Sequence, residues 1–152
     1  MGWIFIYGCG IMYPKSKWEK YTMDPHVFVP KNKFDTFGIP LLNQMSDKEI
    51  LPAIPRLLEW IQDMNWPVAA EVVSLLAKHQ SITEPELVKI LHPDEKDSTW
   101  KYWIIAELLP RFEKPLSEEL LAAVRRIAEH PNRDESLEEA DQMAREYLEH
   151  YA

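Results

Sequence analysis

Beyond residue 40, apolar positions recur at helical spacing. The clearest segment is 67–78, where valine, leucine and alanine form one broad apolar arc and Glu71, Ser74 and Lys78 share the opposite side. All four glycines lie at or before position 38, and the remaining 114 residues hold nine prolines. Proline suits helix starts and ends, whereas tight β-hairpin turns favour glycine or asparagine at positive φ. The pattern predicts an all-α fold.

Capping signals and prolines set the expected helix limits. Ser46-Asp47-Lys48-Glu49 and Thr83-Glu84-Pro85-Glu86 read as capping boxes, and Asp97-Ser98 reads as a third helix start. Pro52 and Pro55 interrupt the helix that opens at Ser46, so we expect a short helical turn there, followed by a main helix over 54–62. The other expected helices cover 67–78, 84–91, 99–109, 117–129 and 134–150.

The segment 100–109 differs from the others because apolar residues surround it on nearly every side. Lys101 and the Glu107/Arg111 pair are its polar exceptions. A helix that is apolar all round is buried, so this segment is predicted to form the centre of the domain. On that basis Trp103→Ala is expected to lower stability by about 3–5 kcal/mol.

A faint internal repeat accompanies the helices. Asp63 and Trp66 recur 34 residues later as Asp97 and Trp100. A period in the mid-thirties with two helices per unit is typical of an α-solenoid, a stack of antiparallel helical hairpins. We expect one helical-repeat domain over residues 26–152, preceded by an N-terminal extension, residues 1–25.

Charge is uneven along this acidic chain, whose formal net charge is −8. Residues 1–35 carry a net +2, and residues 113–149 carry eleven acids against five bases. An acidic surface repels phosphate groups, which argues against nucleic-acid and anionic-membrane partners and favours a basic protein. The single cysteine, Cys9, excludes an intrachain disulfide, and a cytoplasmic protein is expected.

The N-terminal segment Gly2–Met12 is apolar, but no basic residue precedes Trp3, and the continuous apolar run Trp3–Tyr7 is too short for a typical signal peptide. Ile6-Tyr7-Gly8-Cys9 only faintly resembles a lipoprotein cleavage site. The alternatives are a biological start at Met12 or Met23, or a short appendage on the domain.

Catalytic chemistry finds little support. Three histidines, His79, His92 and His130, each follow an apolar helical run, at or near a helix C-terminus, where a positive charge is stabilising. None of them has the spacing of metal ligands. The serines lack nucleophile motifs, and no glycine-rich phosphate loop occurs. No catalytic residue, metal or cofactor is predicted.

A cluster of aromatic and polar residues is the remaining candidate site for binding a partner. Its members are Trp60, Asp63, Asn65, Trp66, Asp97, Trp100, Lys101, Tyr102 and Trp103. In one interpretation the aspartates cap helices and the tryptophans pack between repeats. In the other, part of the cluster lines a groove that binds a partner, since Trp and Tyr dominate binding hot spots.

Two tryptophan-dense stretches, LLEWIQDMNWPVA (57–69) and WKYWIIAELLP (100–110), carry a family resemblance, together with PKNKFD (30–35) and RIAEHPNRDESLEEADQMA (126–144). Over residues 30–149 the chain resembles the bacterial family called domain of unknown function 5071. The resemblance implies a HEAT-like helical fold and no established activity.

Three functions stay open at this point. The first is a non-catalytic protein-binding module, in its narrowest form an immunity-type protein that neutralises a basic toxin. The second is a small-molecule-binding protein or enzyme with a pocket between hairpins walled by Trp66, Trp100 and Trp103. The third is a domain that assembles with itself.

Overall fold

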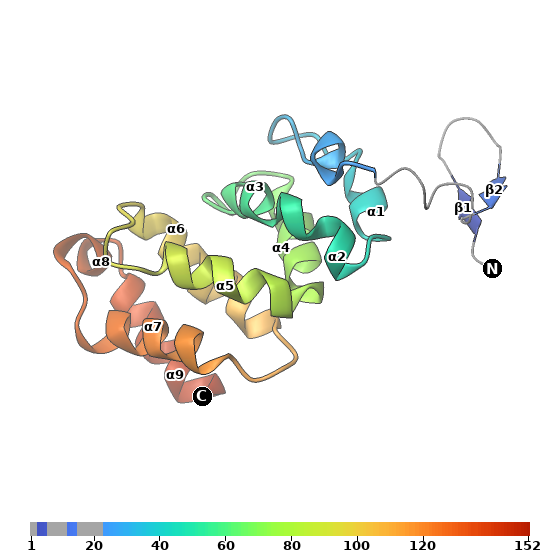
Figure 1. Ribbon diagram of the computed structural model, residues 1–152. Helices are drawn as coiled ribbons and strands as arrows, with labels where there is room; N and C mark the ends of the chain where they lie inside the picture. The colour runs from blue at the N-terminus through green and yellow to red at the C-terminus, as the bar shows by residue number, and fades with distance from the viewer. Residues whose placement is uncertain (1–2, 6–11, 15–22) are drawn as a thin grey trace.

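The computed structural model describes residues 3–5, 12–14 and 23–152 (Figure 1). From residue 23 onward all the regular structure is helical, which confirms the all-α prediction for the domain. In the predicted extension, β1 (Trp3–Phe5) pairs antiparallel with β2 (Met12–Pro14). The expectation about Cys9 lies outside the described residues.

The helical elements follow in chain order. They are the 3₁₀ turn η2 (Pro25–Phe28), α1 (Ile39–Leu42), α2 (Asp47–Ile50), the 3₁₀ turn η3 (Leu51–Ala53), α3 (Ile54–Glu59), α4 (Ala69–Lys78), α5 (Gln80–Ile90), α6 (Ser98–Trp103), the π-helical η4 (Ile104–Leu108), the 3₁₀ turn η5 (Leu109–Arg111), α7 (Glu118–Glu129), α8 (Arg133–Leu137) and α9 (Ala140–Tyr151).

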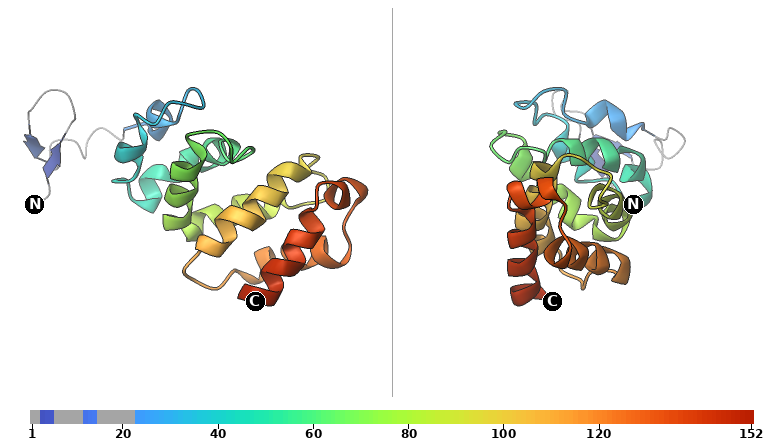
Figure 2. Two further views of the ribbon diagram at one scale, coloured as in Figure 1. Left: turned by 180° about the vertical axis from the view of Figure 1, so that it is seen from behind. Right: turned by 90° about the vertical axis from the view of Figure 1, so that its left-hand side faces the viewer.

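The helices form two layers. In one layer α3 packs against α5, and α5 packs against α7. In the other, α4 packs against η4, and η4 packs against α9; this second layer faces the viewer in the left panel of Figure 2. The layers are joined because α3 contacts α4 and α7 contacts α9. A single apolar core runs between them, with Leu57, Leu76, Leu87 and Ile104 fully buried.

Several predicted helix starts are confirmed. Ser46 and Glu49 form the reciprocal capping box at α2, and Ser117 caps α7. The prolines at 52 and 55 divide the first helix as expected, into α2, η3 and α3.

The capping box predicted at Thr83 is wrong. Helix α5 begins at Gln80, separated from α4 only by His79, so Thr83 lies inside the helix. Its hydroxyl shares its hydrogen between the carbonyl oxygens of Leu76 at 3.2 Å and His79 at 2.9 Å, both at the end of α4. Thr83 therefore bridges the tight α4–α5 junction instead of starting a helix.

Two helices are less regular than predicted. The segment 99–109 forms a continuous rod, but it changes from α-helix in α6 to π-helix in η4 and 3₁₀ in η5, and Pro110 lies within η5. The last helix, predicted over 134–150, is broken into α8 and α9 where Glu139 adopts a left-handed φ of 59°. No helix in the described part of the chain is long and apolar enough to cross a bilayer.

Candidate functional site

The aromatic members of the predicted site form two close pairs. Trp60, which ends α3, contacts Trp66 edge-to-face at 5.7 Å between ring centroids. On α6, Tyr102 and Trp103 form a second edge-to-face pair at 5.0 Å. All four rings are half-buried. Trp60 and Tyr102 pack against the core. A partner could therefore contact only the exposed parts of these two rings and of Trp66 and Trp103.

The two aspartates have different roles, although the repeat predicted the same one. Asp97 caps α6 by accepting the backbone N–H of Trp100 at 2.9 Å, as expected. Asp63 instead accepts the backbone N–H and the side-chain amide of Asn65, which closes a turn before α4. Asp63 therefore shapes the loop between α3 and α4, and α4 begins without a side-chain cap.

Trp100 and Lys101 do not belong to a binding surface. Trp100 is buried, and its indole N–H donates to the carbonyl oxygen of Leu58 at 3.0 Å. Lys101, a polar exception on an otherwise apolar helix and a candidate partner contact, has no exposed side-chain surface. Both side chains are thus corrected from candidate partner contacts to structural residues, because neither can reach a partner without unfolding its surroundings.

Lys101 can be buried because it forms an ion pair with a buried acid, Glu135. Its ammonium group donates to Glu135 at 2.7 Å and to the carbonyl oxygen of His92 at 2.8 Å. Glu135 also receives two hydrogen bonds from the guanidinium of Arg126 and one from the backbone N–H of Asn132. This buried ionic cluster, Lys101, Arg126 and Glu135, joins α6, α7 and α8, and every charge in it has an opposite partner.

Glu135 and Arg126 were not among the residues predicted for this site. Two signals were available: a lone lysine on an otherwise apolar helix needs a buried partner, and Glu135 follows Lys101 at the period of the repeat.

Glu135 makes stability depend on pH. Burial acts to raise its pKa, but the hydrogen bonds from Arg126 and Lys101 outweigh burial and lower the pKa from 4.5 to about 2. The unfolded chain binds a proton near pH 4.5 and the folded chain only near pH 2, so the stabilisation is complete above pH 4.5 and lost as pH falls toward 2.

We therefore expect wild type to lose about 3 kcal/mol more than Glu135→Gln between about pH 7 and pH 2, since the amide does not titrate. Urea unfolding of both proteins across this range measures the difference. An identical pH dependence in the two proteins would show that Glu135 has an ordinary pKa in the folded state.

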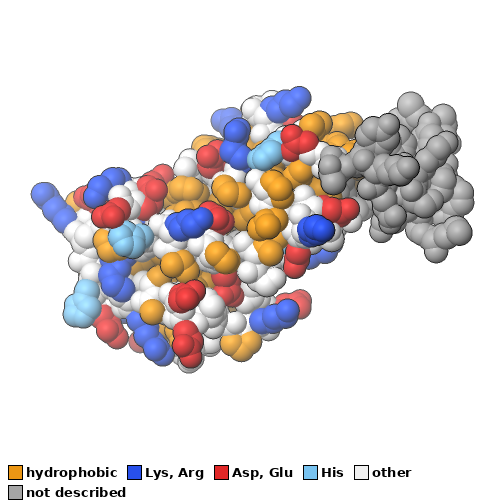
Figure 3. All heavy atoms as spheres, viewed as in Figure 1, with side chains coloured by type: hydrophobic (Ala, Val, Ile, Leu, Met, Phe, Trp, Pro, Cys, Tyr) orange, Lys and Arg blue, Asp and Glu red, His pale blue; other side chains and the backbone are white. Residues whose placement is uncertain are grey.

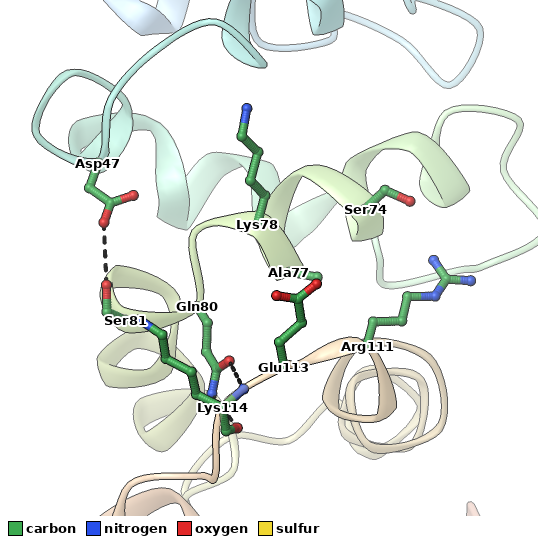
Figure 4. Close-up of a pocket in the computed structure, with 9 residues that line it drawn as sticks. All are labelled: Asp47, Ser74, Ala77, Lys78, Gln80, Ser81, Arg111, Glu113 and Lys114. Atoms are coloured by element: carbon green, nitrogen blue, oxygen red, sulfur yellow. Dashed lines mark hydrogen bonds between the residues drawn. The ribbon is translucent and has the colours of Figure 1, made fainter.

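A pocket of about 430 Å³ lies away from the tryptophans, where α4 and α5 meet the segment after η5 (Figure 4). None of the three tryptophans expected to wall a pocket lines it; the lining is mostly polar: Asp47, Ser74, Ala77, Lys78, Gln80, Ser81, Arg111, Glu113 and Lys114. A site for an apolar ligand would instead need mostly apolar walls.

Much of this pocket's polar lining is already bound within the protein. Asp47 receives hydrogen bonds from His79 and Ser81, and the first of these lowers the pKa of Asp47 below its ordinary value. Gln80 exchanges hydrogen bonds with the backbone of Lys114, and Lys78 donates to the carbonyl oxygen of Asn43. These bonds hold neighbouring helices together.

The C-terminal helices carry an excess of exposed acids. The exposed acids are Glu118, Glu119, Glu129, Asp134, Glu138, Glu139, Glu146 and Glu149. Among the described residues of α7–α9, ion pairs join only Glu135 and Asp141 to bases. Arg126 and Arg145 take part in those pairs, which leaves Arg125 and Arg133 to offset the eight exposed acids.

Comparison with known proteins agrees with the resemblance noted in the sequence. A family described as a domain of unknown function, DUF5071, matches residues 28–148, a range that includes both tryptophan-dense stretches and the buried ionic cluster. No curated protein matches the chain. The match extends over most of the chain, and the protein therefore belongs to the DUF5071 family.

Proposed function

We propose that this protein is a non-catalytic, cytoplasmic protein-binding module, a short HEAT-like α-solenoid whose acidic C-terminal third binds a basic protein. The observation that carries the proposal is the uncompensated charge of α7–α9, where eight exposed acids face two free arginines. Such a surface attracts a basic partner over long distances and accelerates association.

The repeat architecture is supported by polar contacts between chain segments about one repeat apart. Ser81 bonds to Asp47 at a separation of 34 residues, Gln80 to the backbone of Lys114 at 34, and Lys101 to Glu135 at 34. Contacts that recur at one separation are expected when successive hairpins stack in the same way. Extended stacks of this kind commonly present a binding surface.

The two half-exposed tryptophans supply the second element that a binding surface needs. Charge steers association, but affinity comes mainly from large side chains that become buried in the complex. Trp66 and Trp103 each keep part of the ring exposed while an aromatic neighbour fixes its orientation. A partner that covers either ring would bury apolar surface at little loss of side-chain freedom.

The test compares two triple variants with equal charge change. Glu129→Gln/Glu146→Gln/Glu149→Gln removes three exposed acids of α7 and α9, none of them in the first turn of its helix, where negative charge stabilises. Glu59→Gln/Glu71→Gln/Asp94→Asn removes three exposed acids from the first two thirds of the chain; because Glu71 lies in the first turn of α4, thermal unfolding checks that this variant is folded.

We expect wild type and the second variant to capture the same basic protein from an extract, with salt-dependent binding, and the first variant to lose at least tenfold in affinity. Equal capture by both variants, or capture that is insensitive to salt, would refute the acidic surface as the binding site.

In the narrowest version, the basic partner is a toxin that this protein neutralises. Co-expression with the captured protein should then restore growth, and the first triple variant should restore less. A captured protein that is harmless when expressed alone would rule out the toxin version while leaving the protein-binding module intact.

A further inference from the structure

The N-terminal end of the helical domain, from Met23 to Phe37, exposes large apolar side chains. Phe34 is 68% exposed, Phe37 77% and Val27 63%, and Met23 is also exposed. Figure 3 shows hydrophobic side chains gathered at this end, and the neighbouring η3 exposes Leu51. Clusters of this kind are uncommon on a monomer's surface and mark interaction sites.

The loop that carries the two phenylalanines is fixed in place. The Asn32 side chain accepts the backbone N–H of Phe34 at 2.9 Å. The Asp35 carboxylate accepts two more, from Lys31 at 3.0 Å and from Phe37 at 3.2 Å. The aromatic rings are therefore held outward by a rigid loop, so burying them would require little ordering of the backbone.

Contacts outside the loop hold it to the rest of the domain. The backbone N–H at Val68 donates to the carbonyl oxygen of Lys33 at 3.1 Å, which ties the loop to the start of α4. Gly38 sits so close to Phe28 that a Cβ would lie 2.1 Å from its carbonyl oxygen. We call Lys31, Lys33, Phe34 and Phe37 the head surface.

At the other end of the chain, the turn between α8 and α9 offers a complementary surface. Leu137 is 66% exposed, and the acids Asp134, Glu138 and Glu139 are exposed around it. Arg133 is the one exposed base nearby in sequence. We call Asp134, Leu137, Glu138 and Glu139 the tail surface.

The charges of the two surfaces favour contact between the head surface of one copy and the tail surface of another. The head surface has two exposed lysines, and the one carboxylate within its loop, Asp35, is engaged by two backbone N–H groups. Two heads would bring lysines against lysines, and two tails would bring acids against acids. A head on a tail pairs opposite charges and buries Phe34 and Phe37 beside Leu137.

We propose that a second copy of this chain docks its head surface on the tail surface of the first, so that copies associate head to tail. Such a contact is heterologous, and unless its rotation closes a ring it extends into open chains. Both surfaces are small, so the association is weak and builds up only at high protein concentration.

The experiment is sedimentation velocity of the full chain over a wide concentration range, at about 0.1 M and about 1 M salt, where the Debye length falls from about 10 Å to about 3 Å. We expect the weight-average sedimentation coefficient to rise with concentration at low salt and much less at high salt. A strict monomer at every concentration and salt would overturn the proposal.

Two variants separate the surfaces. Phe34→Ser/Phe37→Ser blocks the head, and Leu137→Ser/Glu139→Lys blocks the tail while leaving the hydrogen bond between Glu138 and Thr99 intact. Each should be monomeric alone, with at least a tenfold rise in the concentration needed for association. An equimolar mixture should form dimers that do not extend, since one intact head meets one intact tail.

A matched control, Tyr151→Ser/Glu59→Lys, makes the same kinds of change at two exposed residues outside the head surface, the tail surface and the eight exposed acids of α7–α9, and should associate like wild type. Association of the tail-blocked variant alone would indicate a head-to-head dimer and overturn the proposal. Undiminished association of the head-blocked variant, or a mixture that stays monomeric, would do the same. Thermal unfolding of each variant confirms that it is folded.

Discussion

Lys101→Met is expected to lower the free energy of unfolding by about 3–5 kcal/mol, the usual result of removing one member of a buried ion pair. The large effect arises because Glu135 and Lys101 are both fully buried and 2.7 Å apart. Without the ammonium group, Glu135 keeps its bonds to Arg126 and Asn132 but loses one counter-charge, and the His92 carbonyl loses a donor. Methionine fills most of the same volume, so lost packing contributes little.

Urea unfolding of Lys101→Met, Glu135→Met and the double variant measures the coupling between the two charges. The loss of unfolding free energy in the double variant should be markedly smaller than the sum of the losses in the two single variants. Glu135→Met alone leaves the buried Lys101 without a counter-charge, whereas the double variant leaves only the partly exposed Arg126 unpaired. Lys89→Met, which removes a solvent-exposed partner of Glu86, is the control and should cost less than about 1 kcal/mol. Similar losses for Lys101→Met and Lys89→Met would mean that the buried cluster is not a stabilising unit.

The helical periodicity of the sequence predicted a buried helix at 100–109 but not the burial of Lys101 with an acidic partner. The pattern around 100–109 correctly indicated a core helix, with Ile104, Ile105 and Leu108 buried. It identified Lys101 only as a polar exception and gave no partner for it, because a helical wheel shows only the residues of one helix. The partner comes from α8, and no local pattern reports a contact made 34 residues away.

Capping motifs were reliable where the preceding chain was a loop and failed where it was a helix. Ser46 and Asp97 cap α2 and α6 as predicted, each after a non-helical segment. Thr83 has the same motif, but the chain upstream is already helical from Gln80. Glu84 of that motif is buried and accepts the backbone N–H of Ser117, so tertiary contacts decided its role.

The break at Glu139 had no signal in the sequence. The residues around it, Leu137 to Ala140, contain neither glycine nor proline, and a glutamate rarely adopts positive φ. The separate short helix α8 is what brings Glu135 into the interior, capped by Asn132 through a reciprocal capping box. A buried ionic contact thus outweighs the local preference for one continuous helix.

Trp100→Ala is expected to cost about 3–5 kcal/mol, and Trp103→Ala less than about 2 kcal/mol, which revises the sequence-based expectation for Trp103. Trp100 is only 9% exposed and donates its indole N–H to Leu58 across 42 residues of sequence. Trp103 is half-buried and leans on Tyr102. Replacing Trp100 opens a cavity between α3 and α6, whereas replacing Trp103 removes a ring that solvent already reaches.

Chemical unfolding of the two alanine variants, together with Trp100→Phe, separates packing from hydrogen bonding. Trp100→Phe keeps an aromatic ring but removes the indole donor, while the Leu58 carbonyl keeps the backbone N–H of Ile61 at 3.2 Å, so a smaller loss of about 0.5–1.5 kcal/mol is expected. If Trp103→Ala were the more destabilising alanine variant, Trp103 would be a core residue. It would then no longer qualify as a contact for a partner, and Trp66 would remain as the aromatic contact in addition to the acidic helices α7–α9.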